Sequence, residues 1–170
     1  LIKIPADISD ETAAASFLKG LTVWALLHKT YAVQPGDTIL AYAAAGGVGT
    51  IMGQWAKQLS ARVIGVVGSD DKLAIARQYG CDEVINYNKT DIAASVRQLT
   101  NGGGVDVVYD SMGQATFTAS LDCLKPLGML VSFGNATGPV PPVDILDLMR
   151  RGSLFLTRPT LFNYIATRDQ

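Results

Sequence analysis

Apolar segments of two kinds alternate along the chain. Six are short and rich in β-branched or aromatic residues, and several are continuous rather than interrupted by polar residues. Continuous apolar runs of this length are typical of strands that are buried on both faces of a parallel sheet. The predicted strands are 38–43, 62–67, 83–85, 105–109, 129–133 and 153–157.

Segments with a helical period separate these strands. Shorter stripes lie within 92–99 and 117–124, and two more helices are predicted ahead of the first strand, one opened by Ser9 or Asp10 and ending near Leu18, the other from Leu21 to about Tyr31. The longest apolar stripe follows the first strand and consists of Val48, Ile51, Met52, Trp55, Ala56 and Leu59.

Residues that favour helix ends lie at the expected places. Ser69 or Asp70 can cap the helix after the second strand, Thr90 can cap the next one, and Gly80 suits a left-handed residue after a helix. Strands that alternate with helices through short connections imply right-handed crossovers. The sequence therefore predicts an α/β fold, a Rossmann-type doubly wound parallel sheet of about six strands with helices on both faces.

Composition narrows the class of protein. The chain has 170 residues, is 48% hydrophobic and carries a formal net charge of −1, which is typical of a soluble globular domain and argues against a nucleic-acid surface. No stretch approaches the roughly 20 apolar residues of a membrane helix, and the first residues do not resemble a signal peptide. We therefore expect no nucleic-acid partner, no membrane association and a cytoplasmic location.

The cysteine and histidine content bears on metal binding and on the redox compartment. Cys81 and Cys123 lie far apart in segments of regular structure, so free thiols in a reducing compartment are expected. His28 is the single histidine, and a packed or solvent-facing position on its helix is the expected one. One histidine and two separated cysteines predict no zinc site of the usual kind, and no metal is expected.

A glycine-rich turn carries the chemistry. The residues AAAGGVG at 43–49 follow an apolar strand and begin an amphipathic helix. The usual dinucleotide fingerprint is GxGxxG at such a turn, where backbone N–H groups at the helix start face the pyrophosphate. Here Ala44 replaces the first glycine, while Gly46 leaves room for a phosphate and Gly49 permits close packing of helix and sheet. The turn predicts a dinucleotide site.

The end of the second strand indicates which dinucleotide is bound. Domains that select NAD place an acidic residue there, and this chain has Val67 at the expected position. A neutral residue removes repulsion against a 2′-phosphate, and Ser69 and Lys72 can bind one. NADPH is therefore favoured. Asp70 and Asp71 leave an alternative open, because either could reach the ribose, although helix capping and first-turn charge also account for them.

Seven segments together resemble the NADPH-dependent quinone oxidoreductases, the zinc-free, zeta-crystallin-like branch of the medium-chain dehydrogenase/reductase superfamily. The resemblance covers nearly the whole chain, and the last two segments are narrower signatures than the superfamily motif. The segments are SFLKGLTV at 16–23, the turn at 43–49, QWAK at 54–57, VINY at 84–87, VYDSMG at 108–113, VSFGN at 131–135 and GSLFLTRP at 152–159.

The resemblance implies cofactor-binding roles at matching positions. Thr22 would lie by the nicotinamide, and Gly47 and Val48 by the pyrophosphate, next to Gly46 and Gly49 of the turn. The remaining roles are divided between the two ends of the cofactor. Gly68, Ser69 and Lys72 would hold the 2′-phosphate with Tyr87 beside it, Ser111 would lie near the adenine ribose, and Phe133, Gly134 and Asn135 near the nicotinamide ribose.

Three of these residues could instead have a structural role. Tyr87 could be a half-buried aromatic residue at a strand end, Ser111 could cap a helix, and Phe133 could belong to the core. The resemblance assigns no catalytic residue within this chain, because family members have an upstream catalytic domain and a C-terminal return to it. Arg158 does not match the late cofactor-binding arginine of the family.

The predicted organisation follows from that resemblance. Residues 1–36 would be a helical lead-in and linker to a catalytic domain outside the sequence, 37–158 the dinucleotide-binding domain, and 159–170 the start of the return. The implied activity is hydride transfer from NADPH to a quinone, with the isolated fragment inactive or nearly so. A homodimer is expected through the edge strand around 153–157.

Other functions remain open. An NADPH-dependent reductase of enones or alkenals would use the same nucleotide half, and a non-catalytic, crystallin-like protein would bind NADPH without turnover. A methyltransferase is a more distant possibility, since glycines at a helix start and Lys72 suit phosphates better than S-adenosylmethionine.

Overall fold

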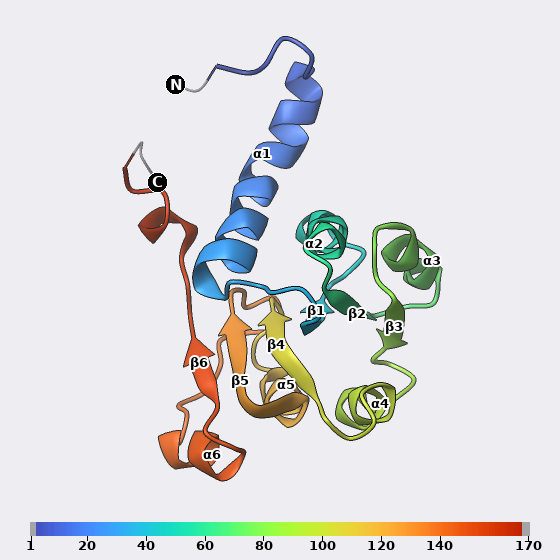
Figure 1. Ribbon diagram of the computed structural model, residues 1–170, viewed down its shortest axis with the longest axis vertical. Helices are drawn as coiled ribbons and strands as arrows, with labels where there is room; N and C mark the ends of the chain where they lie inside the picture. The colour runs from blue at the N-terminus through green and yellow to red at the C-terminus, as the bar shows by residue number, and fades with distance from the viewer. Residues whose placement is uncertain (1–2, 168–170) are drawn as a thin grey trace.

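A six-stranded, fully parallel sheet forms the centre of the molecule (Figure 1). The computed structural model describes residues 3–167. The strand order is β3-β2-β1-β4-β5-β6, with consecutive strands running outward in both directions from β1. The strands are β1 (Thr38–Tyr42), β2 (Arg62–Val67), β3 (Glu83–Asn86), β4 (Val105–Asp110), β5 (Leu124–Ser132) and β6 (Phe155–Thr157).

Helices cover both faces of this sheet (Figure 1). One core lies under α1, α2 and α3, and the other under α4 and α5, because alternate residues of each strand point to opposite faces. The predicted doubly wound α/β fold is confirmed. The helices are α1 (Asp10–Trp24), η1 (Ala25–Thr30), α2 (Gly47–Gln58), α3 (Asp71–Gln78), α4 (Ile92–Leu99), α5 (Phe117–Asp122), α6 (Ile145–Arg150) and the 3₁₀ turn η2 (Leu161–Asn163).

The prediction of two separate helices before β1 is wrong. The chain forms α1 and continues directly into the π-helical turn η1, with the Ala25 N–H bonded to the carbonyls of Leu21 and Thr22. Gly20 does not end the helix, because a single glycine weakens a helix by about 1 kcal/mol without blocking a hydrogen bond. Ser9 is confirmed as the N-cap, since its hydroxyl accepts the Thr12 N–H at 3.1 Å.

Helix-end signals gave mixed results. Gly80 has φ of +103° just after α3, as expected. Thr90 is not a cap; Asp91 is, and its carboxylate accepts the Ala94 N–H at 2.7 Å, where its charge also suits the helix dipole. Asp70 occupies the N-cap position of α3, but its side chain makes no capping bond.

Two strands begin two or more residues from the predicted start, the ends of β1, β3, β4 and β5 each differ from prediction by one residue, and one helix was not predicted. β5 begins at Leu124, five residues early, because Leu124 pairs with Val105 before the register shifts to Val107 with Met129. β6 begins only at Phe155, since Ser153 has φ of +58°, which does not fit a strand. Helix α6 was not predicted; it has exposed apolar residues and no buried ones, so it lacks the stripe that identifies a packed helix.

Candidate functional site

The glycine-rich turn lies between β1 and α2, at the point where the strand order reverses. β2 and β3 lie on one side of β1, and β4 to β6 on the other, so the carboxyl ends of β1 and β4 flank a topological switch point. Ligands of doubly wound sheets bind at this position. Gly46 is the N-cap of α2 and has no side chain to bond the first N–H groups of the helix, which also lack an intrahelical acceptor, as at any helix start; among residues 3–167 no side-chain cap replaces it.

Close packing accounts for the residues of this turn. A Cβ on Gly49 would lie 2.4 Å from the carbonyl oxygen of Ala43 and 2.6 Å from the Cα of Ala44, so the helix can approach the strand only with glycine there. Ala44 is buried, and its methyl group faces Gly65 of β2. The alanine that replaces the first glycine of the fingerprint therefore fills the core and does not obstruct the helix start.

Lys19 adds a cation that the sequence did not reveal. A Cβ on Gly47 would lie 2.7 Å from Lys19 Cε and 3.2 Å from its Nζ, so the lysine side chain lies over the start of α2. Its ammonium donates a hydrogen bond of 2.8 Å to the Ala15 carbonyl. Lys19 belongs to α1, and only the packing of α1 against α2 brings it to the turn, so no local pattern could have identified it.

A cleft of about 270 Å³ joins the glycine turn to the end of β2. From the predicted set it contains Gly46, Gly68, Lys72 and Tyr87. The Tyr87 ring lies against Gly68, where a Cβ would be 2.9 Å from the phenol oxygen, and it is 38% exposed, so part of the ring is open to a ligand in the cleft. The cleft is lined by Ala43, Ala45, Gly46, Val66, Val67, Gly68, Lys72, Tyr87 and Met112.

β2 ends in a neutral residue, as the sequence predicted. Val67 is its last residue, is buried and lines the cleft, so no acidic side chain comes from that position. Lys72 is exposed on the first turn of α3 and also lines the cleft. Gly47, Val48 and Ser69 lie beside these residues in sequence but outside the cleft lining.

A buried carboxylate fixes the loop after β4. Asp110 accepts hydrogen bonds from the hydroxyls of Thr116 and Ser120, at 2.8 and 2.7 Å, and from the backbone N–H groups of Met112 and Gly113. Ser120 Oγ also lies 3.1 Å from the Tyr42 phenol, which donates to it because Ser120 gives its single proton to Asp110, and burial raises the pKa of that tyrosine. This role of Asp110 was not predicted, because its network joins residues that are up to 78 positions apart.

The same loop brings two predicted residues together. The Ser111 carbonyl oxygen would lie 2.4 Å from a Cβ on Gly134, so the loops after β4 and β5 touch at these positions. Ser111 also accepts the Ala136 N–H through its carbonyl at 3.2 Å. The alternative that Ser111 caps a helix is wrong, because α5 begins after Thr116.

Phe133 and Asn135 face different cavities. Phe133 and Thr22 line one of about 170 Å³, together with Thr30, whose buried hydroxyl has no hydrogen-bond partner among the described residues. The Thr22 hydroxyl itself donates to the Leu18 carbonyl at 2.8 Å. This cavity lies between η1 and the chain after β6 and is completed by Ala25, Leu26, Pro159, Leu161 and Tyr164.

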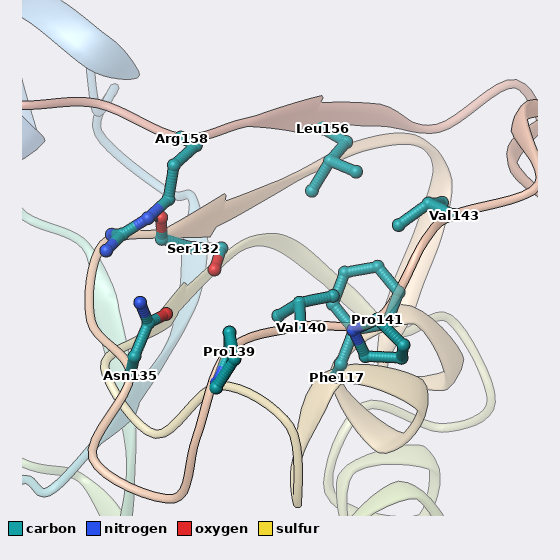
Figure 2. Close-up of a pocket in the computed structure, with 9 residues that line it drawn as sticks. All are labelled: Phe117, Ser132, Asn135, Pro139, Val140, Pro141, Val143, Leu156 and Arg158. Carbon is teal, nitrogen blue, oxygen red and sulfur yellow. Dashed lines mark hydrogen bonds between the residues drawn. The ribbon is translucent and has the colours of Figure 1, made fainter.

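Asn135 lines a separate cavity of about 310 Å³ (Figure 2). Figure 2 shows Arg158 and Ser132 at one end of it, and Phe117 with Pro141 at the other. Arg158 donates to the Ser132 carbonyl at 2.8 Å, so its guanidinium ties the end of β5 to the chain after β6. The predicted run 133–135 is thus divided between two cavities and the Ser111 contact.

Cysteine and histidine have structural positions. Both cysteines are buried free thiols, and burial raises the pKa of Cys81 to about 11 and of Cys123 to about 12. The His28 ring packs on Trp55 with centroids 5.4 Å apart. Within residues 3–167, no three His, Cys, Asp or Glu side chains form a group that could hold a metal ion. No helix in that range is long and apolar enough to span a bilayer.

Fold and site together define a Rossmann-type α/β domain with a cleft at the switch point of its sheet. Residues 47–166 match the family model described as zinc-binding dehydrogenase, and the chain belongs to that family. It is 54% identical to a quinone oxidoreductase of Salmonella typhimurium, over 98% of this chain and 51% of the relative. It is 49% identical to a 2-haloacrylate reductase of a Burkholderia species, over 100% of this chain and 52% of the relative.

A solved structure gives the same result. The Escherichia coli quinone oxidoreductase complexed with NADPH matches with a TM-score of 0.96 and 50% identity, over 99% of this chain and 52% of that one. The chain thus spans about half the length of the curated relatives it matches. The predicted resemblance to the quinone oxidoreductases is confirmed.

Proposed function

We propose that this chain is the cofactor-binding half of an NADPH-dependent reductase that transfers hydride to a quinone. The observation that carries the proposal is the cleft that joins the glycine turn to Lys72, with buried, neutral Val67 between them. That arrangement suits a dinucleotide with a 2′-phosphate. Similarity to quinone oxidoreductases, one of them in a complex with NADPH, supports it.

The residues of the chain fit such a cofactor. The start of α2 offers free N–H groups to a pyrophosphate, with Gly46, Gly47, Val48 and Gly49 presenting backbone and Lys19 a positive charge. At the adenosine end, Gly68, Ser69, Lys72 and Tyr87 would surround the 2′-phosphate, and Ser111 would lie by the ribose. At the other end, Thr22, Phe133, Gly134 and Asn135 would surround the nicotinamide ribose.

The cofactor and the protein would have different roles in the reaction. Bound NADPH supplies the hydride, and the protein orients it and excludes water. A quinone is already electron-poor, so the residues of this chain need to position the cofactor rather than polarise a carbonyl. We assign no catalytic residue here and expect acceptor-binding residues in the other half of the protein.

The organisation of the intact protein is part of the proposal. Residues 1–36 would lead in from the catalytic domain, 37–158 would form the nucleotide-binding domain, and 159–170 would begin the return, with 1–2 and 168–170 lying outside the described residues. We further propose a homodimer joined at β6. A cytoplasmic location would fit the two free thiols.

A reductase of activated alkenes is the second candidate, and one relative favours it specifically. The relative named 2-haloacrylate reductase is 49% identical to this chain, the same value as for one of the quinone oxidoreductases. Steady-state oxidation of NADPH by the full-length protein, with a benzoquinone and with 2-chloroacrylate as acceptors, separates the two. We expect faster turnover with the quinone. Faster turnover with the acrylate would favour the second candidate, and NADPH binding without turnover of either would favour a non-catalytic protein.

The 2′-phosphate assignment has a direct test. Lys72→Ala in the full-length protein should weaken NADPH binding by about 10- to 100-fold, since it removes a charged hydrogen bond to the phosphate. NADH lacks that phosphate and should bind as before, and Lys72→Arg should retain most of the NADPH affinity. Calorimetric titration of both dinucleotides measures the effect, and equal losses for both would remove the assignment.

A further inference from the structure

Asp70 is the first acidic residue after β2, in the region where domains that select NAD place a carboxylate for the ribose. Its side chain does not cap α3. Instead, one carboxylate oxygen accepts a hydrogen bond of 2.7 Å from the Asn86 amide, and the other is bonded to the Lys89 ammonium. Both partners belong to the end of β3 and the loop that follows it.

That loop is tied to the end of β2 at further points. The Asn88 amide donates to the Gly68 carbonyl at 2.6 Å, and the Tyr87 N–H donates to the Val67 carbonyl at 3.1 Å. Tyr87 and Gly68 both line the nucleotide cleft, as Lys72 does. Neither Lys89 nor Asp70 is part of that lining. Asp70 lies two residues from Gly68 and two from Lys72 in the chain, so its charge is beside the cleft, and Lys89 is paired with it.

The Lys89–Asp70 ion pair affects the site because Asp70 is charged. Hydrogen bonds from Lys89 and Asn86 hold the pKa of the Asp70 carboxyl below its usual value, so the group stays ionised at neutral pH. Protonation therefore does not remove its charge, and an unpaired carboxylate there would repel a 2′-phosphate and attract a ribose hydroxyl. The Lys89 and Asp70 side chains are 63% and 53% exposed, and exposed ion pairs contribute little to folding.

We propose that Lys89 is a specificity-determining residue of the nucleotide site, which acts by pairing with Asp70 and thereby cancels the negative charge that would oppose the 2′-phosphate of NADPH. The inference rests on the proposed function. Lys72 binds the phosphate from the cleft, while Lys89 pairs with the neighbouring carboxylate of Asp70. Asp71, the other acid of this turn, is exposed on α3 and serves as a reference for charge alone.

The test uses Lys89→Ala in the full-length protein, with calorimetric titration of NADPH and NADH at low salt. We expect the dissociation constant for NADPH to rise about tenfold, the effect of a carboxylate near a doubly charged phosphate in water, and that for NADH to stay constant or fall. Lys89→Ala/Asp70→Asn should return NADPH binding to the wild-type level. Lys89→Gln, which keeps the length of the side chain, should behave like the alanine variant.

Controls separate this inference from its alternatives. Lys57→Ala breaks the exposed Lys57–Asp82 pair at the far end of α2 and should change neither affinity, and Asp71→Asn should not rescue Lys89→Ala. An unchanged preference in Lys89→Ala would overturn the proposal. So would a loss that Asp70→Asn fails to restore, because Lys89 would then bind the phosphate directly. If the wild-type protein binds no NADPH, the proposed function itself fails.

Discussion

Gly49 and Gly20 both lie within helices, but the space around them differs. A Cβ on Gly49 would meet the backbone of the glycine turn at 2.4 Å, whereas a Cβ on Gly20 would have no atom within 4 Å. Gly49 is therefore needed for packing of α2 against β1. Gly20 gives α1 no packing advantage and costs backbone entropy.

The two positions should therefore respond in opposite directions to the same substitution. Gly49→Ala should lower the free energy of unfolding by about 2–3 kcal/mol, because backbone atoms must move. Gly20→Ala should raise it by about 0.5–1 kcal/mol through helix propensity. Urea unfolding of both variants measures these changes. A stable Gly49→Ala protein would show that the turn can relax and that close packing does not require glycine.

At the scale of elements, the loop after β4 depends on one buried carboxylate. Asp110 is 1% exposed and supplies the acceptor for two hydroxyl and two backbone donors. The network connects β4 to α5 and, through Ser120 and Tyr42, to β1. It holds the loop that carries Ser111 and Met112 beside the cleft at the end of β2.

Removal of this carboxylate should be costly. Asp110→Ala should lower the free energy of unfolding by about 3–5 kcal/mol, because buried donors lose their acceptor. Asp122→Ala is the matched control on α5, where the carboxylate pairs with Arg151 and is 45% exposed, and it should cost less than about 1 kcal/mol. Denaturant unfolding of the two variants measures the difference, and equal losses would contradict a structural role for the buried network.

At the scale of the whole molecule, β6 is an edge strand. It pairs with β5 on one side, and Phe155 is 55% exposed. An apolar edge strand invites pairing with another chain. Figure 1 shows that the chain leaves β6 and runs beside α1.

The proposed dimer gives a test at this scale. Phe155→Lys should convert a dimer of the full-length protein into monomers, because a charge on the edge disfavours pairing. Ile75→Lys on α3, at the opposite edge of the sheet, should leave the dimer intact; Ile75 is 39% exposed. Light scattering coupled to size exclusion gives the masses. A monomeric wild-type protein at high concentration would exclude β6 as a dimer interface.

The sequence by itself determined the order of the six strands, the helices that alternate with β1 to β5, the class of fold and the location of the glycine turn. These follow from local patterns: apolar runs for buried strands, a helical stripe after the turn, and glycines where backbone must approach backbone. It also predicted correctly that β2 ends in a neutral residue, Val67. Its errors at Gly20, Thr90 and the start of β5 occur where two local signals compete and packing selects between them, whereas α6 was missed because it has no buried apolar stripe.

Only the tertiary structure decided which distant side chains share a site. Lys19 reaches the start of α2 from another helix, and Lys89 reaches Asp70 from the loop after a neighbouring strand. The sequence predicted that Asp70 is a helix cap or a ribose ligand. In the structure its carboxylate accepts hydrogen bonds from Asn86 and Lys89 instead. Charges act through space over a few ångströms, and sequence spacing does not encode those distances when the partners lie on different elements.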